Sequence, residues 1–404
     1  MILYDIVIVG AGASGLISAI VSAKRGKRVL ILEKNNKIGK KLLATGNGKC
    51  NITNIRPTLE RFHSKNQKFI RSVLESYNYQ SIKQFFKSIG LELIEAKEGR
   101  VFPMSLQASS VVDILSYECE QLGVKILCEA NVEDINYNKS IYTIRHTKGK
   151  AISKNLIIST GHQSAPQLGG VDDGIFFAKK FGHKRIDSFP SLVQLTSSMP
   201  NFKALAGVRI DSKVRLYKKD KKIEKKGDVL FTSYGISGLA ILDISRFVLE
   251  ELFRSSFVKL EIDLLPKMSR EQLIAIMKKS LRKDSIKPID IWLQGFINKK
   301  LIYIIIKSLG YEKLLEQNIN ITNISKIVEN IKAFEFIVNG SRGYKGCEVA
   351  TGGIDTSDIN PKTMESKIQK GLYLTGEVLD VDADRGGFNL HFAWVSGIRA
   401  GKSV

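Results

Sequence analysis

The chain of 404 residues lacks a hydrophobic run long enough to cross a membrane. The stretch that comes closest, residues 301–306, is far shorter than the roughly 20 apolar residues of a spanning helix. The apolar N-terminus has no basic region before it and is interrupted by glycines, which argues against a secretory signal. We therefore expect a cytoplasmic protein that does not act at a membrane.

Cysteine is also scarce, because the chain has only four residues of this type: Cys50, Cys119, Cys128 and Cys347. They are scattered, and no C-x-x-C pair occurs. This spacing argues against a disulfide framework, a zinc site or a cysteine-ligated cluster, so no metal is expected. Cys119 and Cys128 are predicted to be reduced, mostly buried thiols.

Acidic residues are few relative to basic ones, since 62 Lys and Arg face 40 Asp and Glu. The net charge is +22 and the isoelectric point is about 9.7. One explanation is a lysine-rich, solvated surface. The other is a polyanionic partner, because each neutralised phosphate releases counterions and strengthens binding. The length allows two or three domains.

The most informative segment that is present lies at the N-terminus. The apolar run Ile6–Val9 ends at Gly10. Gly12 and Gly15 then follow in the spacing G-x-G-x-x-G. Gly10 allows a tight strand-to-helix turn, Gly12 lets the backbone approach a pyrophosphate, and Gly15 lets helix and strand pack closely. Phosphates would lie on unpaired N–H groups at the helix N-terminus.

The residues that follow complete a β-α-β unit. A helical stretch, Leu16–Arg25, leads into a second apolar run, Val29–Leu32, which ends in Glu33. Glu33 stands 21 residues after Gly12, where an acid can accept hydrogen bonds from a ribose hydroxyl. The strand, the helix and the acid together predict dinucleotide binding rather than a structural glycine-rich turn.

The pattern of apolar residues predicts further elements. After a glycine-rich segment at 38–54, residues 65–90 and Ala108–Leu122 read as helical, and residues 99–103 between them read as hairpin-like. Four strands are then expected, at Val124–Cys128, Val132–Tyr137, Ile141–His146 and Asn155–Ser159. Residues 190–263 alternate as β-strands do, with a turn at Lys219–Lys222. Residues 268–335 read as helices and are basic, with helical spacing in Gln272–Leu281 and Ile291–Leu309. A strand at Gly371–Glu377 and a helix that runs from about Gly387 to Gly401 complete the chain.

Two later glycine-rich segments favour FAD over NAD. Thr160 and Gly161 follow a buried strand and let the chain pass close to the first loop. Gly376 and Glu377 place a carboxylate at a strand end, where it can hold a ribitol hydroxyl; an ordinary strand-end turn is the alternative. The helix near Gly387 would point its positive N-terminus at the flavin pyrimidine. No second G-x-G-x-x-G occurs, so NADPH or NADH is expected to visit the flavin transiently.

Longer motifs resemble the HI0933-like, or BaiN/RdsA-type, family of bacterial FAD-dependent oxidoreductases. They are the segments 39–54, 99–103, 363–367, 376–382 and 386–390. The resemblance covers essentially the whole chain. It implies an α/β fold, in which a glutathione-reductase-type Rossmann FAD-binding domain carries an inserted β-barrel-like domain and a helical subdomain. The expected bounds are 1–190 with 340–404, 191–264 with about 336–355, and 265–335.

Two segments depart from the family pattern. The run Thr232–Leu239 lacks a histidine and a proline that the family usually has, so no role of that histidine transfers to this chain. The segment Gly161–Pro166 reads Gly-His-Gln-Ser-Ala-Pro in place of Gly-Gly-x-Ser-x-Pro. His162 or His391 can compensate for the missing histidine.

These observations predict two sets of site residues. The cofactor-binding set is Gly10, Gly12, Ala13, Ser14, Gly15, Glu33, Lys34, Lys41, Thr45, Gly46, Asn47, Val132, Thr160, Gly161, Gly376, Glu377, Gly387, Phe388, Asn389 and Leu390. The catalytic set is Cys50, Arg100 and Arg385. Cys50 is the candidate proton donor, beside Lys49, and its alternative role is a small residue packed against the cofactor. Arg100 and Arg385 are expected to orient the substrate, and Asn51, Asn54 and Asn389 to hydrogen-bond the flavin or a uracil.

Members of the family have been labelled aminoacetone oxidases, bile-acid ring reductases and ribosomal RNA dihydrouridine synthases. The +22 charge favours reduction of a uridine in ribosomal RNA to dihydrouridine, with the RNA bound by a basic surface. The alternatives are a small-molecule flavin enzyme, either an amine oxidase or an enone reductase, and a non-catalytic FAD-containing RNA-binding factor. The oligomeric state does not follow from the sequence.

Overall fold

The computed structural model describes residues 2–218 and 221–404. The chain divides into two compact units, which are Met1–Phe189 with Glu348–Val404, and Pro190–Cys347. The first unit therefore joins the two ends of the chain. A separate helical subdomain within 265–335 stays a prediction.

The first unit is built on a seven-stranded sheet in the order β7-β2-β1-β10-β9-β8, with β22 also paired to β10. The strands are β1 (Leu3–Val9), β2 (Val29–Leu32), β7 (Lys125–Leu127), β8 (Val132–Asn138), β9 (Ile141–His146), β10 (Gly149–Ile158) and β22 (Leu372–Leu374). β1 pairs in parallel with both β2 and β10, whereas β8, β9 and the start of β10 form an antiparallel meander. Among the parallel strands, residues Ile6–Val9 of β1 and all of β2 are buried, as their unbroken apolar runs predict.

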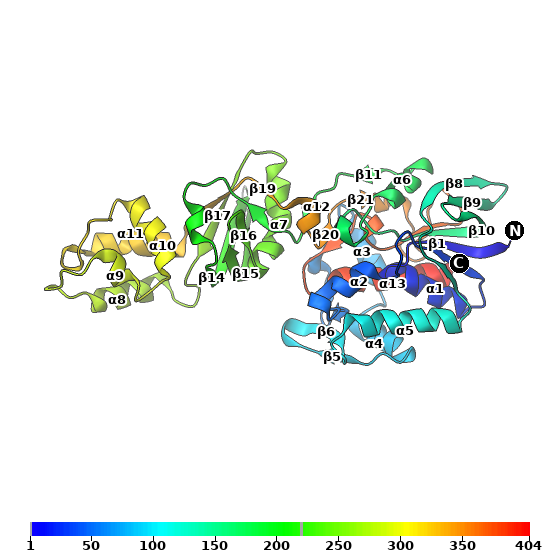
Figure 1. Cartoon of the computed structure of the whole chain (residues 1–404), viewed down its shortest axis with the longest axis horizontal. Helices are drawn as coiled ribbons and strands as arrows, with labels where there is room; N and C mark the ends of the chain where they lie inside the picture. The colour runs from blue at the N-terminus through cyan, green and yellow to red at the C-terminus, as the bar shows by residue number, and fades with distance from the viewer. Residues whose placement is uncertain (1, 219–220) are drawn as a thin grey trace. The chain divides into compact units, whose positions relative to one another are not determined.

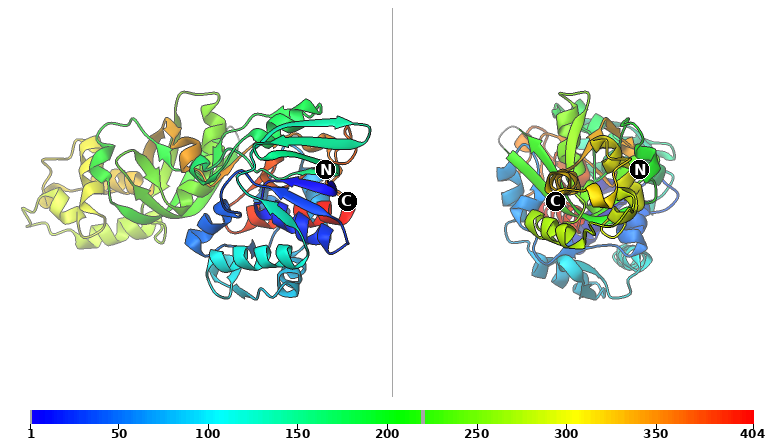
Figure 2. Two further views of the ribbon diagram at one scale, coloured as in Figure 1. Left: turned by 45° about the vertical axis from the view of Figure 1, so that its right-hand side comes forward. Right: turned by 90° about the vertical axis from the view of Figure 1, so that its left-hand side faces the viewer.

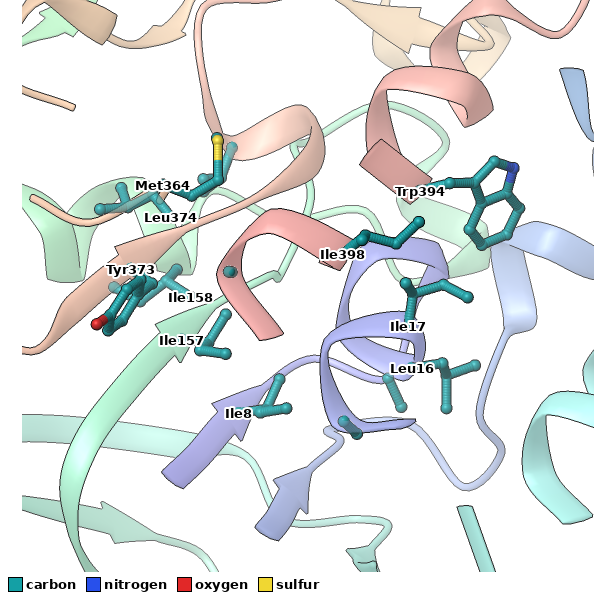
Figure 3. Close-up of a cluster of buried hydrophobic side chains, with 14 of the residues drawn as sticks. Ile8, Leu16, Ile17, Ile157, Ile158, Met364, Tyr373, Leu374, Trp394 and Ile398 are labelled. Carbon is teal, nitrogen blue, oxygen red and sulfur yellow. The ribbon is translucent and has the colours of Figure 1, made fainter. Parts of the chain in front are cut away.

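Helices α1 (Ala13–Ala23) and α13 (Phe388–Ser403) lie side by side on this sheet (Figure 1). Figure 3 shows Ile8, Ile157 and Ile158 on the strands and Leu16, Ile17 and Ile398 on the helices that cover them. All six side chains are buried, so they form the centre of the core. The C-terminal helix thus packs on the N-terminal nucleotide fingerprint.

A second group of elements in this unit brings the family motifs together. A small sheet has the order β3-β6-β5, and β4 pairs with β23. The bounds are β3 (Thr53–Asn54), β4 (Phe62–His63), β5 (Leu93–Glu95), β6 (Arg100–Pro103) and β23 (Asp382–Ala383). The other elements of the unit are α2 (Lys40–Ala44), α3 (Gln67–Leu74), α4 (Tyr79–Ser88), α5 (Ala108–Gln121), α6 (Asp173–Lys180), β11 (Arg185–Ile186), β20 (Val349–Ala350) and β21 (Gly353–Ile354).

The second unit contains an antiparallel sheet in the order β18-β17-β14-β15-β16-β13-β19. These strands are β13 (Leu195–Thr196), β14 (Arg209–Lys218), β15 (Lys221–Phe231), β16 (Gly235–Ser237), β17 (Val258–Asp263), β18 (Phe334–Val338) and β19 (Gly340–Ser341), while β12 (Pro190–Ser191) and α12 (Gly343–Gly346) stand outside it. Part of the predicted turn at Lys219–Lys222 lies outside the described residues.

Four helices lie together at one side of this sheet (Figure 2). They are α8 (Arg270–Ser280), α9 (Ile289–Leu293), α10 (Lys299–Leu309) and α11 (Ile321–Lys332). The expectation of one continuous helical stretch at Ile291–Leu309 is wrong in one respect, because two separate helices, α9 and α10, cover this range. The second begins after Asn298, whose side chain accepts a hydrogen bond from the Lys300 N–H and caps it.

The expectation of β-structure throughout 190–263 is also wrong in one place. Residues Leu239–Leu252 form helix α7, which begins after Gly238 and packs against β14 and β15. Its buried residues recur at helical spacing, including Ile241, Ile244 and Val248. Among the described residues, no helix has both the length and the apolar character of a membrane span.

Candidate functional site

The turn of the nucleotide fingerprint is as tight as its glycines predict. Gly10 has φ +105°, and a Cβ there would lie 2.6 Å from the carbonyl oxygen of Ser159. A Cβ on Gly15 would lie 2.0 Å from the carbonyl oxygen of Gly10. The Ser159 hydroxyl donates to this same Gly10 carbonyl, at 2.9 Å. Only glycine therefore fits at positions 10 and 15, as close helix–strand packing requires.

Gly12 is different, because a Cβ there would meet no atom within 4 Å. This glycine is the N-cap of α1 and supplies no side-chain cap, and the first turn holds no acidic residue. The N–H groups of Ala13 and Ser14 stand in that first turn, where an intrahelical partner is absent by geometry. The open space and the uncapped amides fit a bound pyrophosphate.

Glu33 lies just after β2 and is buried. Its Oε2 accepts a hydrogen bond from the Ala11 N–H at 2.8 Å. Its Oε1 accepts from the N–H and the side-chain amide of Asn35, at 2.8 and 2.7 Å. Since a carboxylate oxygen has two acceptor positions, Oε2 can still take a ribose hydroxyl. The partner Asn35 was not identified from the sequence, because nothing in its local pattern marks it.

A charged cluster forms where β22 ends. The Lys41 ammonium lies 2.7 Å from Glu377 Oε2, and the Ser164 hydroxyl donates to Glu377 Oε1 at 2.7 Å. Burial by itself would raise the pKa of Glu377, but the Lys41 charge and the hydrogen bonds from Lys41 and Ser164 hold that pKa below its ordinary value. Glu377 is therefore a carboxylate at neutral pH.

The structure brings together members of this cluster that are far apart in the chain. Thr160 and Gly161 follow β10, and a Cβ on Gly161 would lie 3.9 Å from Glu377 Oε2. Gly376 has φ +69°, and its N–H donates to the Ser396 hydroxyl of α13 at 3.0 Å. Ser164 was not predicted, although the motif Gly161–Pro166 contains it. Its position in that motif was the available signal.

Three family motifs also converge in the first unit. Thr53 and Asn54 pair with Val101 and Arg100 through β3 and β6. The Trp394 indole N–H donates to the carbonyl of Ile52 at 2.8 Å. The Asn54 side-chain amide also donates to the Gly386 carbonyl at 3.2 Å. Together these contacts join the segments 39–54, 99–103 and 386–390 into one structure.

Gly387 begins α13 at this convergence. It has φ +96°, and a Cβ there would lie 2.4 Å from the Thr53 carbonyl oxygen. It gives α13 no side-chain cap, and the first turn of the helix holds no acid. The helix therefore presents an uncapped positive N-terminus, as it would need to do beside the flavin pyrimidine. Phe388 is buried and packs edge-on against Phe62, whereas Leu390 is half-buried.

The three asparagines predicted to contact flavin or uracil form hydrogen bonds to the backbone in this structure. Asn389 accepts from the N–H of Ala383 and donates to its carbonyl, each at 2.9 Å. Asn54 donates to the carbonyls of Glu98 and Gly386, each at 3.2 Å. Asn51 accepts from the Val101 N–H at 3.3 Å. These side chains hold the motifs together, and their contacts with flavin or uracil stay predictions.

The position of Cys50 does not suit the role of proton donor that the sequence suggested. Its side chain is fully buried in the core, and burial raises the pKa of its thiol to about 11. Lys49 beside it is exposed and does not activate it. The sequence could not show this, because a loop of glycines and polar residues gives no sign of which side chain turns inward. The alternative role, a small residue packed against the cofactor, stays a prediction.

The remaining predicted residues lie around these centres. Thr45, Gly46 and Asn47 form the loop before Cys50, and Asn47 has φ +55°. Lys34 is exposed and 4.0 Å from Asp173, and Val132 is buried at the start of β8. Arg100 donates to the carbonyl of its own turn at Lys97, at 3.1 Å, and Arg385 is half-buried. A role in substrate orientation stays a prediction for both arginines.

The two histidines considered as replacements are interior residues. Burial lowers the pKa of His391 to about 4, and its Nδ1 lies 2.7 Å from the Thr53 hydroxyl. Burial also lowers the pKa of His162, whose Nε2 lies 3.0 Å from the Ser188 hydroxyl. Both rings are therefore neutral at physiological pH and hold neighbouring segments in place.

Comparisons with known proteins agree with this geometry. The family model described as HI0933-like protein Rossmann domain matches residues 4–403. The chain is 34% identical over 404 residues to the ribosomal RNA dihydrouridine synthase of Haemophilus influenzae, with 98% of each chain covered. It is 33% identical over 410 residues to the 3-dehydro-bile acid delta(4,6)-reductase of Clostridium scindens, again with 98% of each covered.

Among solved structures, the fold resembles a 3-ketosteroid delta1-dehydrogenase from Sterolibacterium denitrificans, with a TM-score of 0.52 and 12% identity. The alignment covers 99% of this chain and 98% of the other. Together with the fingerprint and the two uncapped helix N-termini, these matches confirm the resemblance seen in the sequence motifs. The chain belongs to the HI0933-like family of oxidoreductases and has its Rossmann-type FAD-binding α/β fold.

Proposed function

We propose that this protein binds FAD and uses NAD(P)H to reduce a uridine of ribosomal RNA to dihydrouridine. The observation that carries the proposal is the excess of 62 basic over 40 acidic residues. An enzyme for small neutral metabolites gains nothing from such a charge, whereas an RNA enzyme needs contacts to phosphates that do not depend on sequence. The relative from Haemophilus influenzae, named a ribosomal RNA dihydrouridine synthase, supports the same choice.

The residues of the first unit fit FAD at both ends of that molecule. The amides of the first turn of α1 would hold the pyrophosphate, and Glu33 Oε2 would accept a ribose hydroxyl. Glu377, kept ionised by Lys41, would accept a hydroxyl of the ribitol chain. The N-terminus of α13 would face the flavin pyrimidine.

When bound and reduced, FAD supplies a hydride equivalent to C6 of the uracil, and saturation of the C5–C6 bond also consumes one proton at C5. The protein must bring the base out of its stack, because C6 is not accessible within a helix. The α13 N-terminus would stabilise negative charge on the pyrimidine edge of the reduced ring. Arg100 and Arg385 are the candidates for orienting the nucleotide.

The positive charge is concentrated in the second unit. Residues 190–347 contain 28 of the basic and 16 of the acidic residues, a net charge of +12 in fewer than half of the residues. Phosphate contacts made by such a surface add affinity without sequence information. This unit is therefore the proposed RNA-binding part of the chain.

The second candidate function is reduction of a conjugated double bond in a small molecule. It is favoured by the 33% identity to the Clostridium scindens relative, named a 3-dehydro-bile acid delta(4,6)-reductase. The hydride and proton additions are the same in kind, and the substrate would be an enone instead of a uracil. Such a substrate requires no basic surface.

The deciding experiment compares ribosomal RNA from cells with and without the gene. Dihydrouridine is measured by nucleoside mass spectrometry and mapped to positions. Purified protein, FAD and NADPH are then incubated with protein-free ribosomal RNA from the deletion strain, and a parallel reaction contains a steroid enone.

Loss of one dihydrouridine in the deletion strain, and its restoration in vitro, supports the proposal. Unchanged uridine in both tests overturns it. Enone reduction without any effect on RNA favours the second candidate. RNA binding without NADPH consumption indicates a non-catalytic RNA-binding factor.

A further inference from the structure

Helix α10 in the second unit has one apolar and one basic face. Leu301, Ile302, Ile305 and Ile306 are buried. Lys299, Lys300, Tyr303 and Lys307 are exposed, and 299, 303 and 307 recur at the four-residue spacing that places them on one side of a helix. The short 3-10 segment before β14, Phe202–Leu205, contacts α10 and adds the exposed Lys203. These four lysines and Tyr303 are here called the α10 basic face.

The charges of this face are not neutralised by the protein. Among the described residues, none of its four lysines lies within ion-pair distance of a carboxylate. Lys300 donates to the carbonyl of Ala206 at 2.6 Å, and Lys307 lies over the Tyr303 ring at 5.5 Å from its centroid. Neither the carbonyl nor the aromatic ring carries a net negative charge, so both lysines keep their full positive charge. A group of uncompensated cations on one surface attracts a polyanion.

The β14–β15 hairpin is another lysine-rich surface of this unit, and it differs in this respect. Lys218 pairs with Glu250 and Glu251, at 3.1 and 2.9 Å. Lys222 pairs with Glu224 at 3.4 Å. Much of the hairpin charge is thus compensated internally. Compared with the hairpin, the α10 basic face is therefore the stronger attractor of phosphate.

Tyr303 gives the face a second property. Its side chain is 47% exposed, and it lines a hollow together with Met199, Phe202 and Lys203. A large exposed aromatic ring among lysines is the combination with which proteins bind single-stranded nucleic acid, where lysines contact phosphates and a base stacks on the ring. A base in a duplex is already stacked, so this geometry favours an unpaired segment.

We propose that the α10 basic face binds a single-stranded segment of RNA, with Lys203, Lys299 and Lys307 on its phosphates and an unpaired base stacked on Tyr303. This inference rests on the proposed function, because it assigns the RNA contact of the same enzyme. It places substrate binding on a surface that no sequence motif of the family marks.

The test measures binding of a fluorescently labelled single-stranded oligoribonucleotide by anisotropy, over a series of salt concentrations. The triple variant Lys203→Gln, Lys299→Gln and Lys307→Gln should lower the slope of log affinity against log salt by about 2, since each phosphate contact on a single strand contributes about 0.7. Tyr303→Ala should weaken binding by about tenfold without changing the slope. Circular dichroism and unfolding curves verify that both variants fold.

A second triple variant, Lys222→Gln, Lys226→Gln and Lys259→Gln, removes the same net charge from the sheet of the second unit and serves as the control. A much smaller change of slope in the control supports the proposal. Equal changes in both triple variants overturn it, because binding would then follow total charge. Unchanged binding in the α10 variants overturns it as well.

The same variants are assayed for dihydrouridine formation on ribosomal RNA. If the wild-type protein forms dihydrouridine but the α10 variants bind and react normally, only the present inference fails. If the wild-type protein forms none, the proposed function fails, and the binding assay still decides whether the face binds RNA.

Discussion

At the scale of single residues, Gly12 and Gly15 separate cofactor binding from folding. The Gly12 backbone has φ −87°, which alanine also adopts, and a methyl group there would project into open space. A methyl group on Gly15 would instead overlap the Gly10 carbonyl. Gly12→Ala should therefore unfold at the same temperature as the wild type without cofactor, yet bind FAD at least about tenfold more weakly. Gly15→Ala should lose stability in the absence of FAD. Flavin fluorescence titration and thermal unfolding measure the two effects, and normal FAD affinity in Gly12→Ala would place the pyrophosphate elsewhere.

The Glu377 cluster predicts a pH dependence. The folded-state pKa of Glu377 is held below its unfolded value, so its stabilising contribution is complete above about pH 4.5 and disappears as the pH falls through the folded-state pKa. Glu377→Gln should lower the free energy of unfolding at pH 7 by about 1–3 kcal/mol. The deficit relative to wild type should shrink toward pH 3. Urea unfolding at several pH values measures this.

An exposed ion pair provides the control for that measurement. Glu335 pairs with Lys259 at 2.8 Å, and the two side chains are 62% and 54% exposed. Solvent and salt screen such a pair, so Glu335→Gln should change stability little at any pH. A deficit in Glu377→Gln that stays constant between pH 7 and pH 3 would contradict the depressed pKa.

The burial of Cys50 reverses the outcome that the sequence suggested for its replacement. A catalytic proton donor would make Cys50→Ala inactive with an intact flavin spectrum. A thiol inside the core instead predicts a loss of about 1 kcal/mol in unfolding free energy, with turnover within about threefold of wild type. Urea unfolding and NADPH-dependent product formation are measured on one preparation. Abolished turnover in a stable variant would restore the catalytic role.

At the scale of elements, the contact of α1 with α13 depends on small residues. A Cβ on Gly397 would lie 2.6 Å from the Ser14 carbonyl oxygen, and the Ser18 hydroxyl donates to the Gly397 carbonyl at 3.2 Å. Gly397→Ala should push the two helices apart and lower the free energy of unfolding by about 1–3 kcal/mol. Chemical unfolding measures the cost. Gly12→Ala is the matched control, since it adds the same methyl group near α1 without a contact.

The same scale shows why some elements were predictable and others were not. The bounds of β2 and β9 agree with the sequence prediction, because each is a short run set off by polar or turn residues. Helix α7 was missed because its apolar residues fill almost every position near its start, which hides the helical period. The meander part of β10 was missed because Gly149–Lys154 is too polar to read as a strand and is held by pairing with β9.

At the scale of the whole molecule, each unit has its own core. In the second unit, Asp263 is buried, with Lys332 Nζ at 2.8 Å and Arg215 Nη2 at 3.5 Å. Lys332 also donates to the carbonyls of Leu265 and Met268, at 2.9 and 2.6 Å. The ammonium thus joins α11 to the chain that follows β17, within the second unit.

Removing that ammonium should destabilise one unit more than the other. Lys332→Met leaves the buried Asp263 with only the longer ion pair to Arg215. The free energy of unfolding should therefore fall by about 3–5 kcal/mol. Hydrogen exchange should accelerate within 190–347, while exchange within 1–189 and FAD binding stay as in wild type. Faster exchange spread evenly over both units would show that the chain unfolds as one cooperative body.

The sequence alone determined the dinucleotide fingerprint, the joining of both chain ends in one FAD-type fold, the family and the excess of positive charge. These properties follow from local spacing, periodicity and composition, which a linear chain displays directly. Only the tertiary structure decided that Cys50 turns inward, that Asn54 and Asn389 bind backbone, and that Ser164 joins Lys41 and Glu377. Burial and hydrogen-bond partners depend on residues that are distant in the chain, so no local pattern specifies them.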